Sequence, residues 1–116
     1  MHEEQPELFL ILTDLDDPSR QFKAILKDKM VIGKAMNADL VITGDTALAR
    51  KNSFIRYDNN IAYITDLGSV NHTRCNGRIL EQEEYVKLES GMTIGVGRYE
   101  YRVTIEPGNM VEEENK

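Results

Sequence analysis

The strongest constraint on the fold is a succession of short apolar runs separated by polar turn formers. The segment 99–106, YEYRVTIE, alternates most regularly and places Tyr99, Tyr101, Val103 and Ile105 on one face. This alternation is the period of a strand with one buried face. No window of about a dozen residues combines the helical period with helix-capping residues. The sequence therefore predicts a fold made of strands.

Eight further runs have strand character: 7–15, 21–26, 30–34, 39–43, 53–57, 61–65, 85–88 and 93–96. The second run is expected to pair back onto the first across the turn-forming sequence DDPS. The runs 53–57 and 61–65 flank DNN, whose residues tolerate left-handed conformations, and this predicts a hairpin. Roughly ten strands of about five residues each require two packed sheets. The fold class is therefore expected to be an all-β sandwich with loops gathered at its ends.

The chain of 116 residues is long enough for one domain. We expect a tail over residues 1–6, disordered or artificially added, the sandwich over 7–106, and an acidic tail over 107–116. The net charge of −6 comes from residues 1–20 and 106–116, because residues 21–105 hold ten acidic and twelve basic side chains, a net charge of +2. Nucleic-acid binding normally needs a much larger basic excess, so it is not expected.

Several features predict a cytoplasmic protein. The sequence has no apolar run of about eighteen residues, and it has no basic segment followed by a long apolar one at its start. Membrane insertion and secretion are therefore not expected. The single cysteine, Cys75, cannot form an internal disulfide, and a lone thiol suits a reducing compartment.

The sequence carries no recognisable catalytic constellation. The two histidines are His2 and His72, and His72 has no nearby Ser or Cys in a strand–helix turn. Asp14, Asp16 and Asp17 resemble the start of a calcium loop but lack its later Gly and Glu. We therefore expect a protein that is not an enzyme and that has no metal or cofactor.

Basic residues occupy several of the expected loops. They are Lys34, Arg50, Lys51, His72, Arg74 and Arg78. If these loops share one end of the sandwich, their charges and turn-exposed N–H groups could bind an anion such as phosphate. The alternative is that these side chains only face water, and residue spacing alone favours that alternative.

The order of three segments favours anion binding over side chains that only face water. IGKAMNADLVITGDTALARKNSFI at 32–55, YITDLGSVNHTRCNG at 63–77 and VKLESGMTIGVGRYEYRV at 86–103 follow one another as in a known family. The chain resembles the forkhead-associated (FHA) domain over about residues 30–105. The family pattern places Gly-Arg, then Asp, Ser-Arg-x-His, Asp-Leu-x-Ser-x-Asn-Gly-Thr and Asn-Gly. The matching positions are Gly33-Lys34, Asp39, Ala49-Arg50-Lys51-Asn52, Asp66 to Thr73 and Asn76-Gly77.

The resemblance implies an eleven-stranded β-sandwich that binds phosphothreonine in partner proteins. Such modules commonly act in signalling or assembly within larger proteins. In this chain the expected phosphopeptide-binding residues are Lys34, Arg50, Lys51, Asn71 and His72. Arg50 would pair with the phosphate, Lys34 would add a second charge, and Asn71 would bond the peptide backbone. The residues expected to support the loops are Asn52, Ser69, Thr73, Asn76 and Gly77.

The sequence departs from the family pattern at the site itself. Ala49 replaces the phosphate-binding Ser, Asn52 replaces His, and His72 replaces Gly. A hydrogen bond to a charged group contributes about 1.5–3 kcal/mol, so the missing hydroxyl could weaken binding roughly ten- to a hundredfold. Thr46 or Ser53 could supply a substitute hydroxyl. The alternative function is therefore a diverged FHA module that binds partners as a structural or scaffold domain without any dependence on phosphate.

Overall fold

A computed structural model describes residues 7–108 of the chain, and all structural statements below concern these residues. They form eleven strands and no helix, which confirms the predicted all-β class. The strands are β1 (Leu8–Asp14), β2 (Gln21–Ile25), β3 (Lys29–Gly33), β4 (Leu40–Val41), β5 (Ser53–Asp58), β6 (Ile61–Asp66), β7 (Thr73–Cys75), β8 (Arg78–Ile79), β9 (Val86–Leu88), β10 (Thr93–Val96) and β11 (Tyr99–Pro107).

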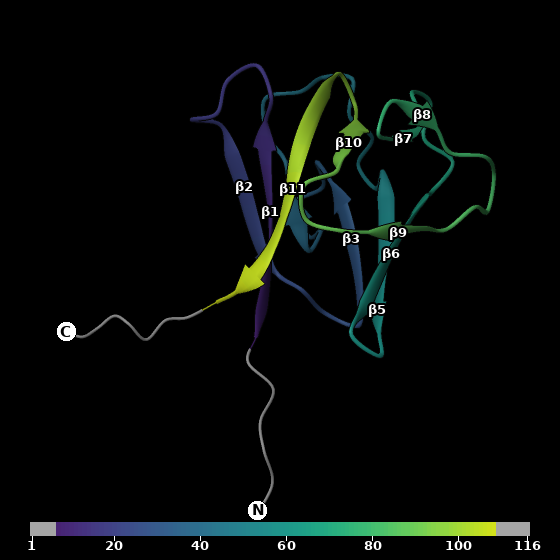
Figure 1. Ribbon diagram of the computed structural model, residues 1–116. Helices are drawn as coiled ribbons and strands as arrows, with labels where there is room; N and C mark the ends of the chain where they lie inside the picture. The colour runs from purple at the N-terminus through teal and green to yellow at the C-terminus, as the bar shows by residue number, and fades with distance from the viewer. Residues whose placement is uncertain (1–6, 109–116) are drawn as a thin grey trace, which may run out of the picture.

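The strands build two sheets that pack face to face (Figure 1). One sheet has six strands in the order β2-β1-β11-β10-β7-β8, and the other has five in the order β4-β3-β5-β6-β9. The two expected hairpins are confirmed, because β2 pairs with β1 and β6 pairs with β5, each antiparallel. Asn59 and Asn60 have φ of 52° and 66°, the left-handed conformation that a two-residue hairpin turn requires.

The core lies between the sheets. The alternation in β11 points Tyr101 and Val103 inward, where they are 0% and 1% exposed, and leaves Arg102 exposed. Leu10, Leu12, Ile55 and Ile64 from β1, β5 and β6 fill the same layer and are fully buried. The predicted strand faces therefore match the observed core.

Strands β7 and β8 lie in a stretch that the apolar pattern assigned to a loop. Thr73–Cys75 pairs with β10, although three residues are too few to display an alternation. Asn76 and Gly77 have φ of 49° and 85° and form the turn into β8. The pattern of apolar runs alone therefore missed one short hairpin, whereas the family resemblance implied the full number of strands.

The register brings four connections to one end of the sandwich. Ser53, which opens β5, pairs with both Ile32 near the end of β3 and Asp66 at the end of β6. Val96 at the end of β10 pairs with Thr73 at the start of β7. The β3–β4, β4–β5, β6–β7 and β10–β11 connections consequently leave the sheets in the same direction, and we call them the loop end. The chain enters β1 and leaves β11 at the opposite end (Figure 1).

The part of the chain that the structure describes contains no helix long and apolar enough to cross a membrane. Residues 1–6 and 109–116, in which the two tails were expected, lie outside the described residues, so these expectations stay predictions. Strand β11 extends to Pro107, which is paired with Leu8.

Candidate functional site

The β3–β4 and β4–β5 loops pack backbone against backbone. The N–H of Lys34 donates to the carbonyl of Ala49 at 3.1 Å, and the N–H of Ala35 donates to the carbonyl of Arg50 at 3.1 Å. A Cβ atom on Gly33 would lie 2.0 Å from the carbonyl oxygen of Arg50, so this approach requires glycine. The contact fixes the backbones of the two predicted phosphate-binding residues, Lys34 and Arg50, side by side.

A buried polar network lies beneath the loops. Asn52, Ser53 and Thr73 are each 0% exposed. The Thr73 hydroxyl donates to Oδ1 of Asp66 at 2.6 Å, since an ionised carboxylate can only accept. Thr73 has no second hydrogen, so Ser53 must be the donor in the 2.8 Å bond between the two hydroxyls. Asn52 completes the network by donating to Ser53 at 3.0 Å and to Thr73 at 3.3 Å.

This network joins the β4–β5 loop to the β6–β7 loop. The side-chain oxygen of Asn52 accepts the N–H of Ala49 at 3.3 Å, and its backbone carbonyl accepts the N–H of Leu67 at 3.0 Å. Asp66 in turn accepts both the N–H of Ser69 at 2.8 Å and its hydroxyl at 2.6 Å. Asn52, Ser69 and Thr73, predicted to support the loops, therefore all lie in one connected network.

Ser53 cannot supply the substitute hydroxyl that the sequence allowed. Its side chain is fully buried, and its oxygen is engaged by Asn52 and Thr73. This expectation is wrong because the inward face of β5 begins at Ser53, whereas a ligand-binding hydroxyl must face solvent. Thr46 is exposed on the β4–β5 loop.

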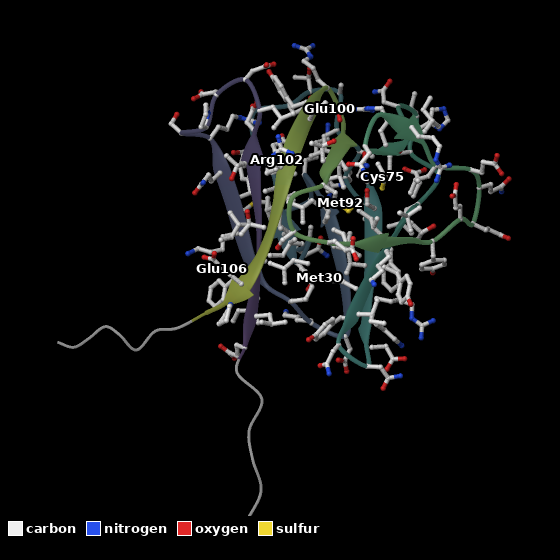
Figure 2. All side chains as sticks on the ribbon, in the orientation of Figure 1. Met30, Cys75, Met92, Glu100, Arg102 and Glu106 are labelled. Atoms are coloured by element: carbon white, nitrogen blue, oxygen red, sulfur yellow. The ribbon has the colours of Figure 1, made fainter. Side chains whose placement is uncertain are left out.

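Asn71 joins the β6–β7 loop to the β4–β5 loop. Its side-chain Nδ2 donates to the backbone carbonyl of Ala47 at 3.0 Å. Its own carbonyl accepts a bond from Nη1 of Arg74 at 3.2 Å. Arg74 also donates to the carbonyl of Gly97 at 3.1 Å and forms a 2.7 Å ion pair with Glu100, which lies at the loop end of β11 (Figure 2). Arg74 is thus engaged by protein groups and holds the β6–β7 loop against the β10–β11 turn.

The β10–β11 turn is a part of the loop end that sequence reasoning missed. Asp45 is 6% exposed and accepts the N–H of Ala47 at 2.9 Å and the N–H of Arg98 at 2.8 Å. Gly97 has a φ of 64°, and a Cβ there would lie 2.3 Å from the Asp45 carboxylate. Arg98, 53 residues after Asp45, is exposed beside the β4–β5 loop. The one available sequence signal was the Gly-Arg pair between two strands, which marks a turn without revealing its neighbours.

Four cationic side chains at the loop end are without an acidic partner among residues 7–108. Lys34, Arg50, Lys51 and Arg98 are exposed, and none of the ion pairs between described residues includes them. Arg78, another of the basic residues in the expected loops, is paired with Glu84 at 2.6 Å. Their hydrogen bond, followed by that from the N–H of Glu81, lowers the pKa of Glu84 to about 2. The loop end therefore presents four exposed cations that form no ion pair within the described residues, an arrangement suited to an anion.

His72 and the Asn76-Gly77 pair take no part in the backbone hydrogen bonds that join the β3–β4 and β4–β5 loops. His72 is exposed, has a φ of 63°, and lines an open cleft of about 520 Å³ with Ile79, Glu81 and other residues. Asn76 bonds to the backbone of Thr93 through both its N–H, at 2.8 Å, and its side-chain oxygen, at 2.9 Å. This bonding attaches the β7–β8 turn to β10. Within residues 7–108, no three His, Cys, Asp or Glu side chains are arranged to hold a metal ion.

Comparison with known proteins identifies the family. The sequence pattern of the FHA domain matches residues 30–97. The chain belongs to the FHA domain family. No curated protein matches it, whereas many solved structures do.

Three of these structures illustrate the likeness. One, from a study of phosphothreonine-dependent FHA domain interactions, is 26% identical, with a TM-score of 0.69 over 87% of this chain and 98% of that one. The FHA domain of FhaA, solved in complex with the intracellular domain of Rv3910, is 27% identical, with a TM-score of 0.67 over 84% and 99%. An FHA domain from Arabidopsis thaliana is 22% identical and has a TM-score of 0.72 over 92% and 93%, a likeness of fold.

Proposed function

We propose that this FHA domain is a protein-interaction module that binds phosphothreonine-containing segments of partner proteins. The observation that carries the proposal is Arg50, which is exposed and forms no ion pair within residues 7–108, on a loop held beside Lys34 and Asn71. The 26%-identical relative from the study of phosphothreonine-dependent interactions supports the same ligand class. The relative solved with a partner protein's domain supports an interaction role.

Each residue would have a distinct task. The guanidinium of Arg50 can make paired, charge-assisted bonds to a phosphate, and the ammonium groups of Lys34 and Lys51 add point charges. The Nδ2 of Asn71 is engaged with Ala47, so its Oδ1 can accept an N–H from the peptide backbone. His72, next to Asn71, would add charge when it is protonated.

Further properties belong to the same proposal. We infer that the chain is not an enzyme, because its sequence carries no recognisable catalytic constellation. We also infer that it does not bind nucleic acid, because residues 21–105 carry a basic excess of only +2. We also infer that residues 7–106 act as one module in the cytoplasm, within or beside a larger signalling or assembly protein. The buried Cys75, whose pKa burial raises to about 11, is consistent with a structural thiol in a reducing compartment.

The test is a titration of the full chain with phosphothreonine peptides and their unphosphorylated twins at physiological salt. We expect binding to require the phosphate and to weaken with added salt. Arg50→Ala should weaken it roughly ten- to a hundredfold, because it removes charge-assisted bonds. Arg56→Ala is the matched control, since Arg56 is an exposed arginine in the middle of β5, away from the loop end.

Two results would contradict the proposal. Full-strength phosphopeptide binding by Arg50→Ala would show that the site is elsewhere. Equal binding of phosphorylated and unphosphorylated peptides would favour the alternative, a diverged module without phosphate dependence. The specific feature that favours this alternative is Ala49, which leaves the loop without the family's hydroxyl.

A further inference from the structure

The side chain of Arg20 links the two layers of the sandwich at one side. Strands β2 and β4 are edge strands of different sheets, and they contact each other. Arg20 directly precedes β2, at the same end of the molecule as the loop end (Figure 1). Its Nη1 donates to the hydroxyl of Tyr101 on β11 at 2.9 Å, and its Nη2 donates to the backbone carbonyl of Thr43, just after β4. Arg20 therefore connects the six-stranded sheet to the start of the β4–β5 loop.

The six-stranded sheet holds the Arg20 guanidinium in place. Its central carbon lies 4.9 Å from the ring centroid of Phe22 and 4.7 Å from that of Tyr99, within the range of cation–π attraction. The carboxylate of Asp14, which is 2% exposed, lies 3.4 Å from Nη1 and balances the charge. Both terminal nitrogens are engaged within the protein. Arg20 therefore does not belong to the cations that are available to a ligand.

The carbonyl that Arg20 binds lies in a weakly held part of the β4–β5 loop. Strand β4 pairs with β3 through only two residue pairs. Gly44, which follows Thr43, has a φ of 81°, and glycine restricts the backbone less than any other residue. The direction in which the chain leaves β4 therefore depends on contacts from outside this segment. Arg20 supplies such a contact at Thr43, seven residues before Arg50.

We propose that Arg20 is a positioning residue, which holds the start of the β4–β5 loop in the conformation that presents Arg50 to the phosphate. This inference rests on the proposed function and adds to it a residue that does not touch the ligand. Other bonds attach the middle of the same loop, at Asp45 and Ala47. A loop that is held in its bound conformation before the peptide arrives loses less conformational freedom on binding, so the affinity is higher.

The experiment compares the full chain with Arg20→Ala in titrations with one phosphothreonine peptide, at a temperature where circular dichroism shows both proteins to be folded. We expect Arg20→Ala to weaken binding about three- to tenfold, because substitutions without ligand contact commonly change affinity by such factors. Leu8→Ala is the stability control, since Leu8 packs against the core at the opposite end of the sandwich (Figure 1). It should lower the stability of the protein and leave the affinity unchanged.

Amide hydrogen exchange of the free proteins gives a second readout, which the loss of a charge at a distance would not change. Exchange in the segment 44–50 should be faster in Arg20→Ala than in the unmutated chain. Leu8→Ala should leave it unchanged, because loop amides exchange through local opening. If Arg20→Ala does not fold, Arg20→Lys replaces it. This variant keeps the charge beside Asp14 but lacks the planar fork, so both effects should appear at smaller size.

Three results would overturn this inference while leaving the proposed function intact. They are an unchanged affinity in the Arg20 variant, an equal loss of affinity in Leu8→Ala, and a lower affinity without faster exchange in the segment 44–50. Absence of phosphate-dependent binding in the unmutated chain would overturn both the inference and the proposed function.

Discussion

Removing the buried hydroxyl of Thr73 or of Thr65 should change the free energy of unfolding in opposite directions, because the two hydroxyls differ in their hydrogen bonds. Thr73 is 0% exposed and Thr65 is 4% exposed, so both side chains are shielded from water. The Thr73 hydroxyl donates to Asp66 and accepts from Ser53 and Asn52. The Thr65 hydroxyl has no hydrogen-bond partner among the described residues. Replacement by valine removes either hydroxyl with little change in shape.

Thr73→Val should destabilise the protein. It removes a bond to a carboxylate, worth about 1.5–3 kcal/mol, and leaves the Ser53 hydroxyl and one N–H of Asn52 without this acceptor. We expect the free energy of unfolding to fall by about 2–4 kcal/mol, a large share of the roughly 5–15 kcal/mol of a typical domain. Thr65→Val should instead raise it by about 1 kcal/mol, because an unbonded buried hydroxyl is costly.

The assay is urea unfolding of both variants and of the unmutated chain, followed by far-ultraviolet circular dichroism. The denaturant slope should stay constant, so that the midpoint reports stability. The reasoning would be refuted if Thr73→Val lost no more stability than Thr65→Val, since the network beneath the loops would then contribute nothing. A lower phosphopeptide affinity of Thr73→Val would further link this network to the position of the loops.

Three further predictions concern single positions. Ala49→Ser should tighten phosphopeptide binding roughly tenfold in a titration, because it restores a hydroxyl beside Arg50; no gain with the fold intact would indicate that this loop does not line the site. His72→Gly should raise the free energy of unfolding by up to about 1 kcal/mol, since the φ of 63° strains a residue with a Cβ; a clear fall in urea unfolding would contradict this. The folded-state pKa of Glu84, about 2, lies below its ordinary 4.5, so its pair with Arg78 stabilises the fold above pH 4.5 and is lost as the pH falls towards 2. A plot of the free energy of unfolding against pH over this range should be flatter for Arg78→Ala than for the unmutated chain. Equal slopes for the two proteins would contradict a stabilising Arg78–Glu84 pair.

The fold was largely predictable from the sequence because strand period and turn chemistry are local. The alternation of 99–106 gave the buried face of β11. Asn59 and Asn60 marked a hairpin because asparagine tolerates positive φ. The ordered motifs, compared with the FHA pattern, placed Arg50, Asn52 and Asn71 on loops that the structure brings together. Strand β7 escaped the periodicity analysis because three residues carry too little of a period.

The sequence by itself therefore determined an all-β sandwich, its turns, and the positions of the cations and of Asn71 along the chain. Only the tertiary structure decided which of those cations are available to a ligand. Arg74 donates a hydrogen bond to the carbonyl of Gly97, and Arg78 forms an ion pair with Glu84, so both are engaged within the protein. Arg98 joined the loop end through Asp45, 53 residues earlier in the chain. The physical reason is that such contacts depend on strand register and sheet packing, which bring together residues that no local pattern relates.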